Sequence, residues 1–492
     1  MKKFALLLSV CLLLLTSFGQ NTLAAPEPDT EAFLTANFHL QSSYNHVLCV
    51  GTGCPASINT AIPCLTDGCS NPSKPYNIQS TYSTIQAASD AAVPGDLIII
   101  MPGTYRGVDV EEKHGANNAY IHFLGWGAPG SVIVNQPSLE GPGRHHFYFI
   151  DTDYYIVQNI VFSGSTTGTG IFFSGYFSET GHFSDHIIVM GIYSRNNNTW
   201  GLHTTQVSYM VVQDSVFTGS QDEHGAYISG GGDHFLIRRN VFQGNNASGL
   251  QANLDPESAT TELFYYLQNR GHGTCGITEE DADFEGPATW DEVKACYDQK
   301  KAQFPADFPD LGEFIDDGIG KDFIIEQNVM DNNGNAGGAA INLASLRQSE
   351  VRNNLVYGNH AGSIMCWDNA YAEVKGLPSS AFGCKGVNIF NNTVVEQSCS
   401  RTSIGFTNDA RDMTVYNNVI ACGRSDAYEI SARSGDGLRS GTNYYYAISI
   451  FDSPGVITID TDPGSGSVTG FTMPQALANF VNPNQNNWVD LS

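Results

Sequence analysis

The chain has 492 residues, with 23 lysines and arginines against 50 aspartates and glutamates, a formal net charge of −27. This balance excludes nucleic acid as a partner, since nucleic-acid binding needs a basic surface. In the simpler interpretation the excess of acidic residues keeps the protein soluble. In a second interpretation some of the carboxylates bind Ca²⁺. The length does not require several domains, because a repeat protein grows by adding repeats.

Residues 1–25 predict a secretory signal peptide. Met1-Lys-Lys is followed by an apolar run and by a small-residue cleavage site at Ala24 or Ala25. The segment Leu8-Ser-Val-Cys11 resembles a lipoprotein box only faintly, because valine is too large before the cysteine. No other stretch is long and apolar enough to span a membrane. We expect a secreted monomer, extracellular or periplasmic.

Cysteine spacing supports export. Of 11 cysteines, Cys11 leaves with the signal peptide and the mature chain keeps ten, an even number that predicts five disulfides. Among the first four cysteines the pairing stays open, and a four-cysteine zinc site is an alternative that their wide spacing disfavours. The expected disulfides are Cys275–Cys296, Cys366–Cys384, Cys399–Cys422, and two bonds among Cys49, Cys54, Cys64 and Cys69.

Residues 26–75 form a cysteine-rich lead-in without periodicity. A short amphipathic helix is predicted next, with Ile85, Ala88 and Ala92 on one face. Val93-Pro-Gly-Asp96 predicts a turn, and the residues after it form a wholly apolar strand. A helix in this position would cover the open end of a solenoid.

A sequence repeat then recurs about every 24 to 27 residues. Each copy begins with a run of β-branched residues, continues with asparagine, an apolar pair and a polar turn, and ends with glycine followed by a short strand of alternating pattern. Val216 and Val241 mark two copies 25 residues apart. A strand-containing period of this length indicates a β-solenoid. Stacked asparagines at an inner turn are expected to bond from coil to coil: Asn240, Asn328, Asn354, Asn392 and Asn418.

The helix, the Val-Pro-Gly-Asp turn, the strand and the Pro102-Gly-Thr-Tyr105 run together resemble the beginning of pectin-lyase-like proteins. The resemblance covers residues 80–460 and implies an all-β, single-stranded right-handed parallel β-helix. That superfamily includes polysaccharide lyases, hydrolases, epimerases and non-catalytic adhesins, so the resemblance specifies fold more than activity. The expected organisation is a β-helix at 76–460, with a helical insertion at 254–321 and a loop at 366–384, and a C-terminal cap or tail at 461–492.

Aligning the repeats on glycine separates inward from outward side chains. The inward stack should contain Leu202, Ala226, Leu250 and Ala339. One outward column should contain His203, Tyr227 and Gln251, and the next Thr205, Ser229, Asn253 and Asn342. Trp200, His224 and Ser248 directly precede the glycines.

These outward side chains predict a carbohydrate site about three coils tall, because aromatic faces suit pyranose rings and polar side chains give directional hydrogen bonds. In the simplest alternative the face is only polar and solvated. The expected substrate-binding residues are Trp200, Thr205, Ser229, Arg238, Gln251, Asn253 and Asp255.

Two reactions fit the patch. In β-elimination from a uronic-acid polymer, His203 or His224 would be the base and Tyr227 the acid, while Arg238, Arg239 or Ca²⁺ neutralises the substrate carboxylate. We favour this lyase interpretation.

The alternatives keep the same fold. In glycoside hydrolysis two carboxylates act, and Asp222, Glu223 and Asp255 are the nearest candidates. The paired-aspartate motifs of polygalacturonase-type hydrolases are absent. A non-catalytic glycan-binding or adhesin solenoid is the third possibility. The motifs Asp151-Thr-Asp153 and Asp460-Thr-Asp462 are further candidates for Ca²⁺ ligands, although such pairs commonly serve turns.

Overall fold

The structure, a computed structural model, describes residues 30–67, 69–138, 145–253, 256–283, 286–308, 320–367, 383–396, 402–407 and 410–422, and beyond them the backbone of four short strands. The expected signal peptide, Cys399, Asp255, Asp460 and Asp462 lie outside the described residues.

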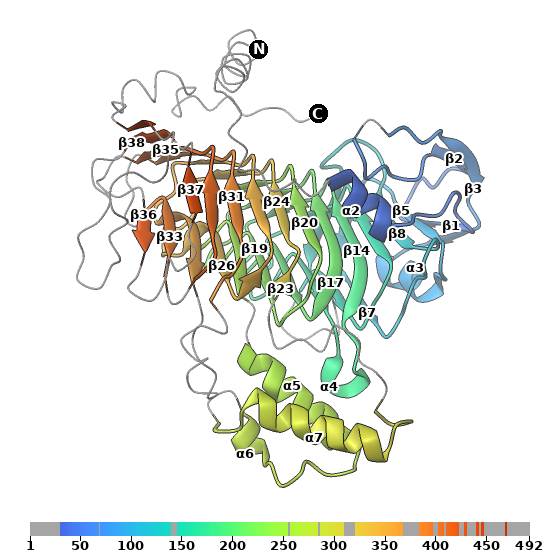
Figure 1. Ribbon diagram of the computed structural model, residues 1–492. Helices are drawn as coiled ribbons and strands as arrows, with labels where there is room; N and C mark the ends of the chain where they lie inside the picture. Colours follow the sequence, from blue (N-terminus) through green and yellow to red (C-terminus); the bar gives the residue numbers. More distant parts are fainter. Residues whose placement is uncertain are drawn as a thin grey trace.

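Most of the described chain coils into a parallel β-helix (Figure 1). One coil runs through β16 (Leu202–Thr205), β17 (Val207–Gln213) and β18 (Val216–Thr218), one strand in each of three sheets. The next strand, β19 (Ala226–Ser229), then pairs in parallel with β16. The predicted solenoid of three strands per coil is confirmed.

Within the described residues, the strands of each sheet lie side by side in order from the N-terminal end of the solenoid. Sheet 1 contains β7 (Val108–Glu111), β10 (Phe147–Ile150), β13 (Ile171–Ser174), β16, β19, β22 (Leu250–Asn253), β26 (Ala339–Ala344), β30 (Gly362–Trp367), β33 (Ile404–Phe406) and β36 (Tyr428–Ile430). Sheet 2 contains β4 (Ser80–Tyr82), β1 (Val47–Val50), β5 (Leu97–Ile100), β8 (Ile121–Gly125), β11 (Tyr155–Gln158), β14 (Ser184–Met190), β17, β20 (Phe235–Arg238), β24 (Ile324–Glu326), β28 (Glu350–Arg352), β31 (Asn388–Phe390), β34 (Thr414–Tyr416) and β37 (Arg439–Gly441). Sheet 3 contains β6 (Gly103–Arg106), β9 (Val132–Gln136), β12 (Val161–Ser163), β15 (Tyr193–Arg195), β18, β21 (Val241–Gln243), β25 (Val329–Asp331), β29 (Leu355–Tyr357), β32 (Thr393–Glu396), β35 (Val419–Cys422), β38 (Tyr444–Tyr446) and β39 (Val468–Thr469). Two small pairs lie outside these sheets, β2 (Ser57–Thr60) with β3 (Lys74–Asn77) and β23 (Gly320–Lys321) with β27 (Leu346–Arg347).

The inward stack on sheet 1 is confirmed for its first three members, Leu202, Ala226 and Leu250, which are at most 2% exposed. The fourth position was predicted wrongly: Leu250 pairs with Ile341, whereas Ala339, although buried, pairs with Gly362. The reason is a longer turn before β26. Its last residue, Gly338, has the left-handed φ of +90° and belongs to the turn, so it does not mark the start of the strand.

The N-terminal end of the solenoid is covered by helix α3 (Ile85–Ala91). Thr84 caps this helix by accepting from the Ala87 backbone N–H, and Ile85, Ala88 and Ala92 pack into the main core. The lead-in is more regular than the sequence suggested. It contributes β1 to sheet 2, where β1 pairs in parallel with β5 on one side and with β4 on the other.

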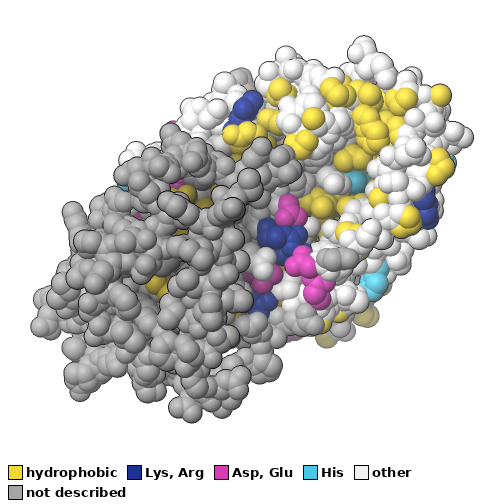
Figure 2. All heavy atoms as spheres, turned by 90° about the horizontal axis from the view of Figure 1, so that it is seen from above, with side chains coloured by type: hydrophobic (Ala, Val, Ile, Leu, Met, Phe, Trp, Pro, Cys, Tyr) yellow, Lys and Arg dark blue, Asp and Glu magenta, His cyan; other side chains and the backbone are white. Residues whose placement is uncertain are grey.

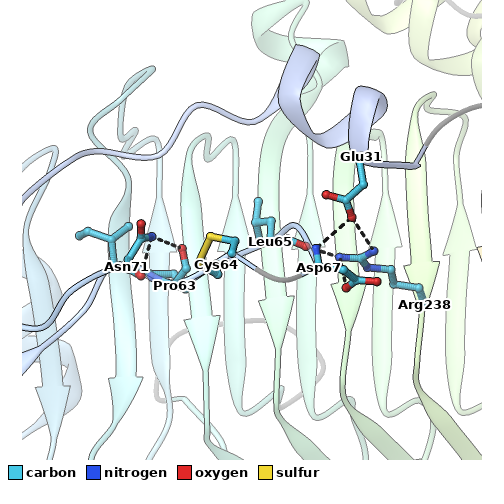
Figure 3. Close-up of a disulfide and its surroundings, with 9 residues drawn as sticks. Glu31, Pro63, Cys64, Leu65, Asp67, Asn71 and Arg238 are labelled. Atoms are coloured by element: carbon cyan, nitrogen blue, oxygen red, sulfur yellow. Dashed lines mark hydrogen bonds and ion pairs between the residues drawn. A yellow bond between two sulfur atoms is a disulfide. The ribbon is translucent and has the colours of Figure 1, made fainter.

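The lead-in also crosses the outer face of sheet 2. Helix α2 (Thr30–Asn37) places Leu34 against a row of apolar side chains from successive strands of that sheet, and Phe38 and Leu65 join it. The disulfide Cys64–Cys69 closes a small loop in this segment (Figure 3). Because Leu34, Phe38 and Leu65 pack on this row, the lead-in shields an apolar face of sheet 2 from solvent.

Seen from above, basic and acidic side chains lie next to each other on the surface, beside apolar ones (Figure 2).

The predicted asparagine ladder is present at the turn between sheets 2 and 3. Asn328 accepts from the backbone N–H of Asn240 at 3.0 Å, and its own amide donates to the Ile237 carbonyl at 2.8 Å and to Asn354 at 3.0 Å. A second ladder, which was not predicted from the sequence, follows sheet 3 and ends on a glutamate. Its members are Asn245, Asn333, Asn359 and Glu396.

A helical segment projects from one side of the solenoid (Figure 1). It contains α5 (Pro256–Asn269), α6 (Glu279–Ala282) and α7 (Trp290–Gln303), has its own apolar core, and is closed by the Cys275–Cys296 disulfide. Helix α4 (Phe177–Thr180), from an earlier coil, packs against α5. No helix among the described residues is long and apolar enough to cross a membrane.

Three of the expected disulfides are present in the described residues, Cys49–Cys54, Cys64–Cys69 and Cys275–Cys296. The expected bond between Cys366 and Cys384 is not formed, and both are buried free thiols that interact with each other. Burial raises the pKa of the Cys366 thiol.

Candidate active site on sheet 1

The two outward columns predicted for sheet 1 are confirmed over three coils. His203 pairs with Tyr227, and Tyr227 with Gln251, in the registers of β16, β19 and β22. The same registers align Thr205, Ser229 and Asn253 in the second column. The strand alternation therefore brings the expected patch to one face.

Asn342 belongs to the first column, not to the second as predicted, because of the longer turn before β26. It pairs with Gln251, and its amide donates to the Gln251 Oε1 at 2.6 Å. Ser248 Oγ lies 3.2 Å from the same oxygen. Gln251 is only 5% exposed. These bonds hold it in a polar chain along the sheet.

An aromatic stack runs along the first column, parallel to the axis of the solenoid. The ring centroids of Phe172 and His203 lie 4.8 Å apart, and those of His203 and Tyr227 lie 5.0 Å apart. The indole of Trp200 lies beside both, 4.3 Å from His203 and 5.5 Å from Tyr227. Tyr148 stacks on Phe172 at 5.4 Å and extends the row by another coil. Because strands repeat every ~4.8 Å, the rings form a continuous ladder.

The hydrogen bonds of His203 fix its tautomer. Its Nε2 lies 3.1 Å from Ser229 Oγ, and that hydroxyl donates its proton to the Thr204 carbonyl. The Nε2 atom must therefore carry the proton and donate, which leaves a lone pair on Nδ1. Burial, then the neighbouring His145 and His224, lowers the pKa of His203 to about 3. The ring is neutral near pH 7.

His224 is oriented the opposite way. Its Nδ1 accepts from the Ser248 backbone N–H at 2.9 Å, so the neutral ring carries its proton on Nε2. That nitrogen lies 3.4 Å from a carboxylate oxygen of Glu223. Burial lowers the pKa of His224 to about 4. The two predicted catalytic histidines thus differ: one offers a lone pair, and the other an N–H.

Three polar atoms of the patch are buried without a hydrogen-bond partner in the described part of the chain. They are the Nε1 of Trp200, the Nδ1 of His203 and the Oδ1 of Asn253. A buried polar group without a partner costs about 1–3 kcal/mol. Such groups gathered at one surface indicate a place where a ligand would supply the missing partners.

Arg238 was wrongly assigned to this patch. It lies on β20 in sheet 2, is 1% exposed, and donates to Gln213 Oε1 at 3.1 Å and to the Leu65 carbonyl (Figure 3). Arg239 bonds Asp214 at 2.6 Å through its Nε. Both arginines hold the lead-in and the turn beside it.

The candidate carboxylates lie in the turn before β19. Asp222 is exposed and accepts from the Asn198 amide at 2.8 Å. Burial, and then the charge of Asp222, raises the pKa of Glu223. The Glu223 carboxylate lies 3.4 Å from the Nε2 of His224, a residue of the patch.

The earlier coils of this face were not predicted from the sequence. His145 stacks on Tyr148 at 5.5 Å and on Phe172 at 4.8 Å, and burial lowers its pKa to about 4. The signal was present, because Gly170-Ile-Phe-Phe-Ser174 follows the same pattern as Gly201-Leu-His-Thr-Thr205. Extending the glycine alignment by one repeat would have placed Phe172 beside His203.

Several solved structures resemble this fold. The alginate lyase from Paenibacillus sp. str. FPU-7 is 12% identical, with a TM-score of 0.42 over 72% of this chain and 96% of that one. Pectate lyase Pel9A is 14% identical, with a TM-score of 0.44 over 84% and 82%. The A-module of mannuronan C-5 epimerase AlgE4 from Azotobacter vinelandii is 13% identical, with a TM-score of 0.38 over 74% and 82%. No protein-family model and no curated protein matches the sequence.

The chain folds as a parallel β-helix. Three parallel sheets, a helix over the N-terminal end and asparagine ladders at the turns define it. On this fold, the aromatic ladder and its unpaired polar atoms make the outer face of sheet 1 the candidate ligand-binding face.

Proposed function

We propose that this β-helix protein is a secreted, monomeric enzyme that cleaves a uronic-acid polysaccharide by β-elimination on the outer face of sheet 1. The observation that carries the proposal is the contrast between the two histidines in the aromatic ladder. His203 has an unshared lone pair on Nδ1, whereas His224 presents an N–H. An elimination needs both kinds of group around one sugar.

In the proposed reaction, His203 Nδ1 takes the proton from the carbon next to the substrate carboxylate. The electron pair forms the carbon–carbon double bond, the glycosidic C–O bond breaks, and Tyr227 protonates the leaving oxygen. Trp200 packs against His203 at 4.3 Å, and the Nδ1 atom is buried. As part of this proposal, the indole turns aside when the sugar binds and exposes its own unpaired Nε1–H.

The substrate carboxylate needs a partner when negative charge develops beside it. With Arg238 committed to sheet 2, the N–H donors of His224 and Trp200 are the proposed partners. A Ca²⁺ ion carried with the acidic polymer could serve the same purpose. Activity that survives exhaustive chelation would assign this role to the protein donors.

A second candidate is glycoside hydrolysis by the carboxyl groups of Asp222 and Glu223. It is favoured by the raised pKa of Glu223, which suits a general acid, beside the exposed carboxylate of Asp222. A third candidate is a glycan-binding protein without catalysis, which would use the same aromatic faces.

The products separate the three. Purified protein is incubated with acidic and neutral glycans, and ultraviolet absorbance and reducing ends are followed together. A lyase yields both signals, because elimination leaves an unsaturated sugar. Reducing ends without ultraviolet absorbance indicate a hydrolase and would overturn the elimination. Binding without either signal indicates a non-catalytic glycan-binding protein.

A further inference from the structure

A second group of polar side chains lies away from the aromatic ladder, at the turns between sheets 1 and 2. Three successive coils contribute to it. His114 comes from the connection between β7 and β8, and Asp151 and Asp153 come from the connection between β10 and β11. His182 comes from the connection between β13 and β14, and Asp185 from the start of β14. Parallel stacking brings these turns together even though the residues are far apart in sequence.

The side chains converge on one point. Ligand atoms of Asp153, His182 and Asp185 all lie within 4.8 Å of one another. His182 Nε2 is 3.5 Å from Asp153 Oδ2. Two ligands about 2.0–2.1 Å from a tetrahedral metal ion lie about 3.3–3.4 Å apart, so this spacing is close to that of a coordinated pair.

The surrounding hydrogen bonds orient these atoms. Asp151 accepts from His182 Nδ1 at 2.8 Å, which directs the lone pair of Nε2 toward Asp153. The Asp153 Oδ1 accepts from the Asp185 backbone N–H at 2.9 Å, and its Oδ2 bonds His114 at 2.8 Å. A carboxylate behind a histidine is the usual support of a metal-binding imidazole.

We propose that His182, Asp153 and Asp185 bind a divalent transition-metal ion of the zinc class, with Asp151 and His114 as positioning residues. The imidazole decides the class, because Ca²⁺ and Mg²⁺ prefer an all-oxygen set. Three protein ligands leave a fourth position for water. The side chains of His182 and Asp185 are 38% and 21% exposed, so an ion can enter from solvent.

The location suggests what the ion stabilises. His182 directly follows a short hairpin formed by α4 and its flanking residues, 175–181, which we call the α4 hairpin. The hairpin ends at Gly181, which is in the left-handed conformation. A hydrogen bond joins α4 to the helical insertion: the side-chain amide of Asn269 in α5 donates to the backbone carbonyl of Ser178 at 2.9 Å. Burial is the main reason that the pKa of Tyr148 on sheet 1 is raised, and Tyr176 in the same hairpin is close enough to add to that shift. The ion would therefore fix the hairpin between the insertion and the aromatic face.

The test uses the full mature chain, stripped with a chelator and titrated calorimetrically with Zn²⁺, Mn²⁺ and Ca²⁺ in separate experiments. We expect one Zn²⁺ per chain. His182→Ala should weaken Zn²⁺ binding at least about a hundredfold, and Asp151→Asn about ten- to a hundredfold, as for groups that support a ligand. His46→Ala is the matched control, because His46 makes a comparable 2.9 Å pair with Asp96 elsewhere. It should bind as the unaltered chain does.

Hydrogen exchange supplies a readout that does not depend on catalysis. Zn²⁺ should slow exchange in the α4 hairpin and in α5 of the unaltered chain and of His46→Ala, and not in His182→Ala. Absence of Zn²⁺ binding by the unaltered chain would overturn the proposal, as would undiminished binding by a folded His182→Ala variant. If that variant fails to fold, His182→Gln replaces it. Preference for Ca²⁺ over Zn²⁺ would overturn the assignment of the imidazole as a ligand.

Discussion

The glutamate that ends the second asparagine ladder should make the protein less stable as pH rises. Glu396 is fully buried, and its carboxyl oxygens accept from the Asn359 backbone N–H at 2.7 Å, the Asn359 amide at 3.0 Å and the Ser363 hydroxyl at 3.0 Å. Burial outweighs these hydrogen bonds and raises the pKa from 4.5 to about 7. The charged form is therefore disfavoured in the folded state.

The sign follows from the proton each state binds. Below pH 4.5 the carboxyl is protonated in both states, so burial carries no penalty from charge. Between 4.5 and about 7 only the folded state keeps the proton, and stability falls as pH rises. Above pH 7 the loss is complete. At 1.36 kcal/mol per pKa unit it amounts to about 3 kcal/mol.

The variant Glu396→Gln removes the titration. Its amide has one acceptor oxygen fewer, which costs stability at every pH alike, so the informative quantity is the change between pH values. We expect the free energy of unfolding by denaturant to fall about 3 kcal/mol further from pH 4.5 to pH 8 in the unaltered chain than in the variant. Equal changes in both chains would refute the assignment of a raised pKa to Glu396.

Three further predictions concern stability and cysteine chemistry. Asn328→Ala should lower the free energy of unfolding by at least about 3 kcal/mol, because it leaves several buried backbone and side-chain groups without a hydrogen-bond partner. Asn246 is half-exposed, so Asn246→Ala is the control and should be nearly neutral, and equal losses in the two variants would contradict a stabilising role of the ladder. Leu34→Ala should cost about 2–5 kcal/mol in the same assay if the lead-in covers sheet 2, and a loss below about 1 kcal/mol would argue against that packing. Alkylation without reduction should label Cys366 and Cys384 only after denaturation, and peptide mapping that finds them bonded to each other would show the free thiols to be wrong.

The solenoid could be predicted because each coil repeats the same residue types at the same positions. Asparagines such as Asn328 recur at inner turns, and glycines such as Gly225 begin strands of sheet 1, so the columns of His203 and Tyr227 follow from the strand period of two. The error at Ala339 arose where a glycine served a turn instead, a difference of backbone φ that composition does not reveal.

What the sequence could not supply were contacts between coils and across sheets. An arginine such as Arg238 is expected near an acidic polymer. Its hydrogen bond to the Leu65 carbonyl depends on how residues 30–67 cross sheet 2, which the sequence does not show. The tautomers of His203 and His224 depend on single hydrogen bonds from neighbouring coils. The convergence of His182 with Asp153 similarly depends on the stacking of turns about 30 residues apart in the chain.

The most direct test of the proposed function is the initial rate of ultraviolet-absorbing product from uronic-acid polymers, measured for the unaltered chain and two single variants. Tyr227→Phe removes the proposed acid, and Tyr209→Phe is the matched control, since Tyr209 stacks between His186 and His234 on sheet 2 much as Tyr227 stacks on sheet 1. We predict a rate at least about a hundredfold lower for Tyr227→Phe, the usual contribution of a general acid, and an unchanged rate for Tyr209→Phe. Equal rates in all three chains, or no such product from any uronic-acid polymer, would contradict the proposed elimination.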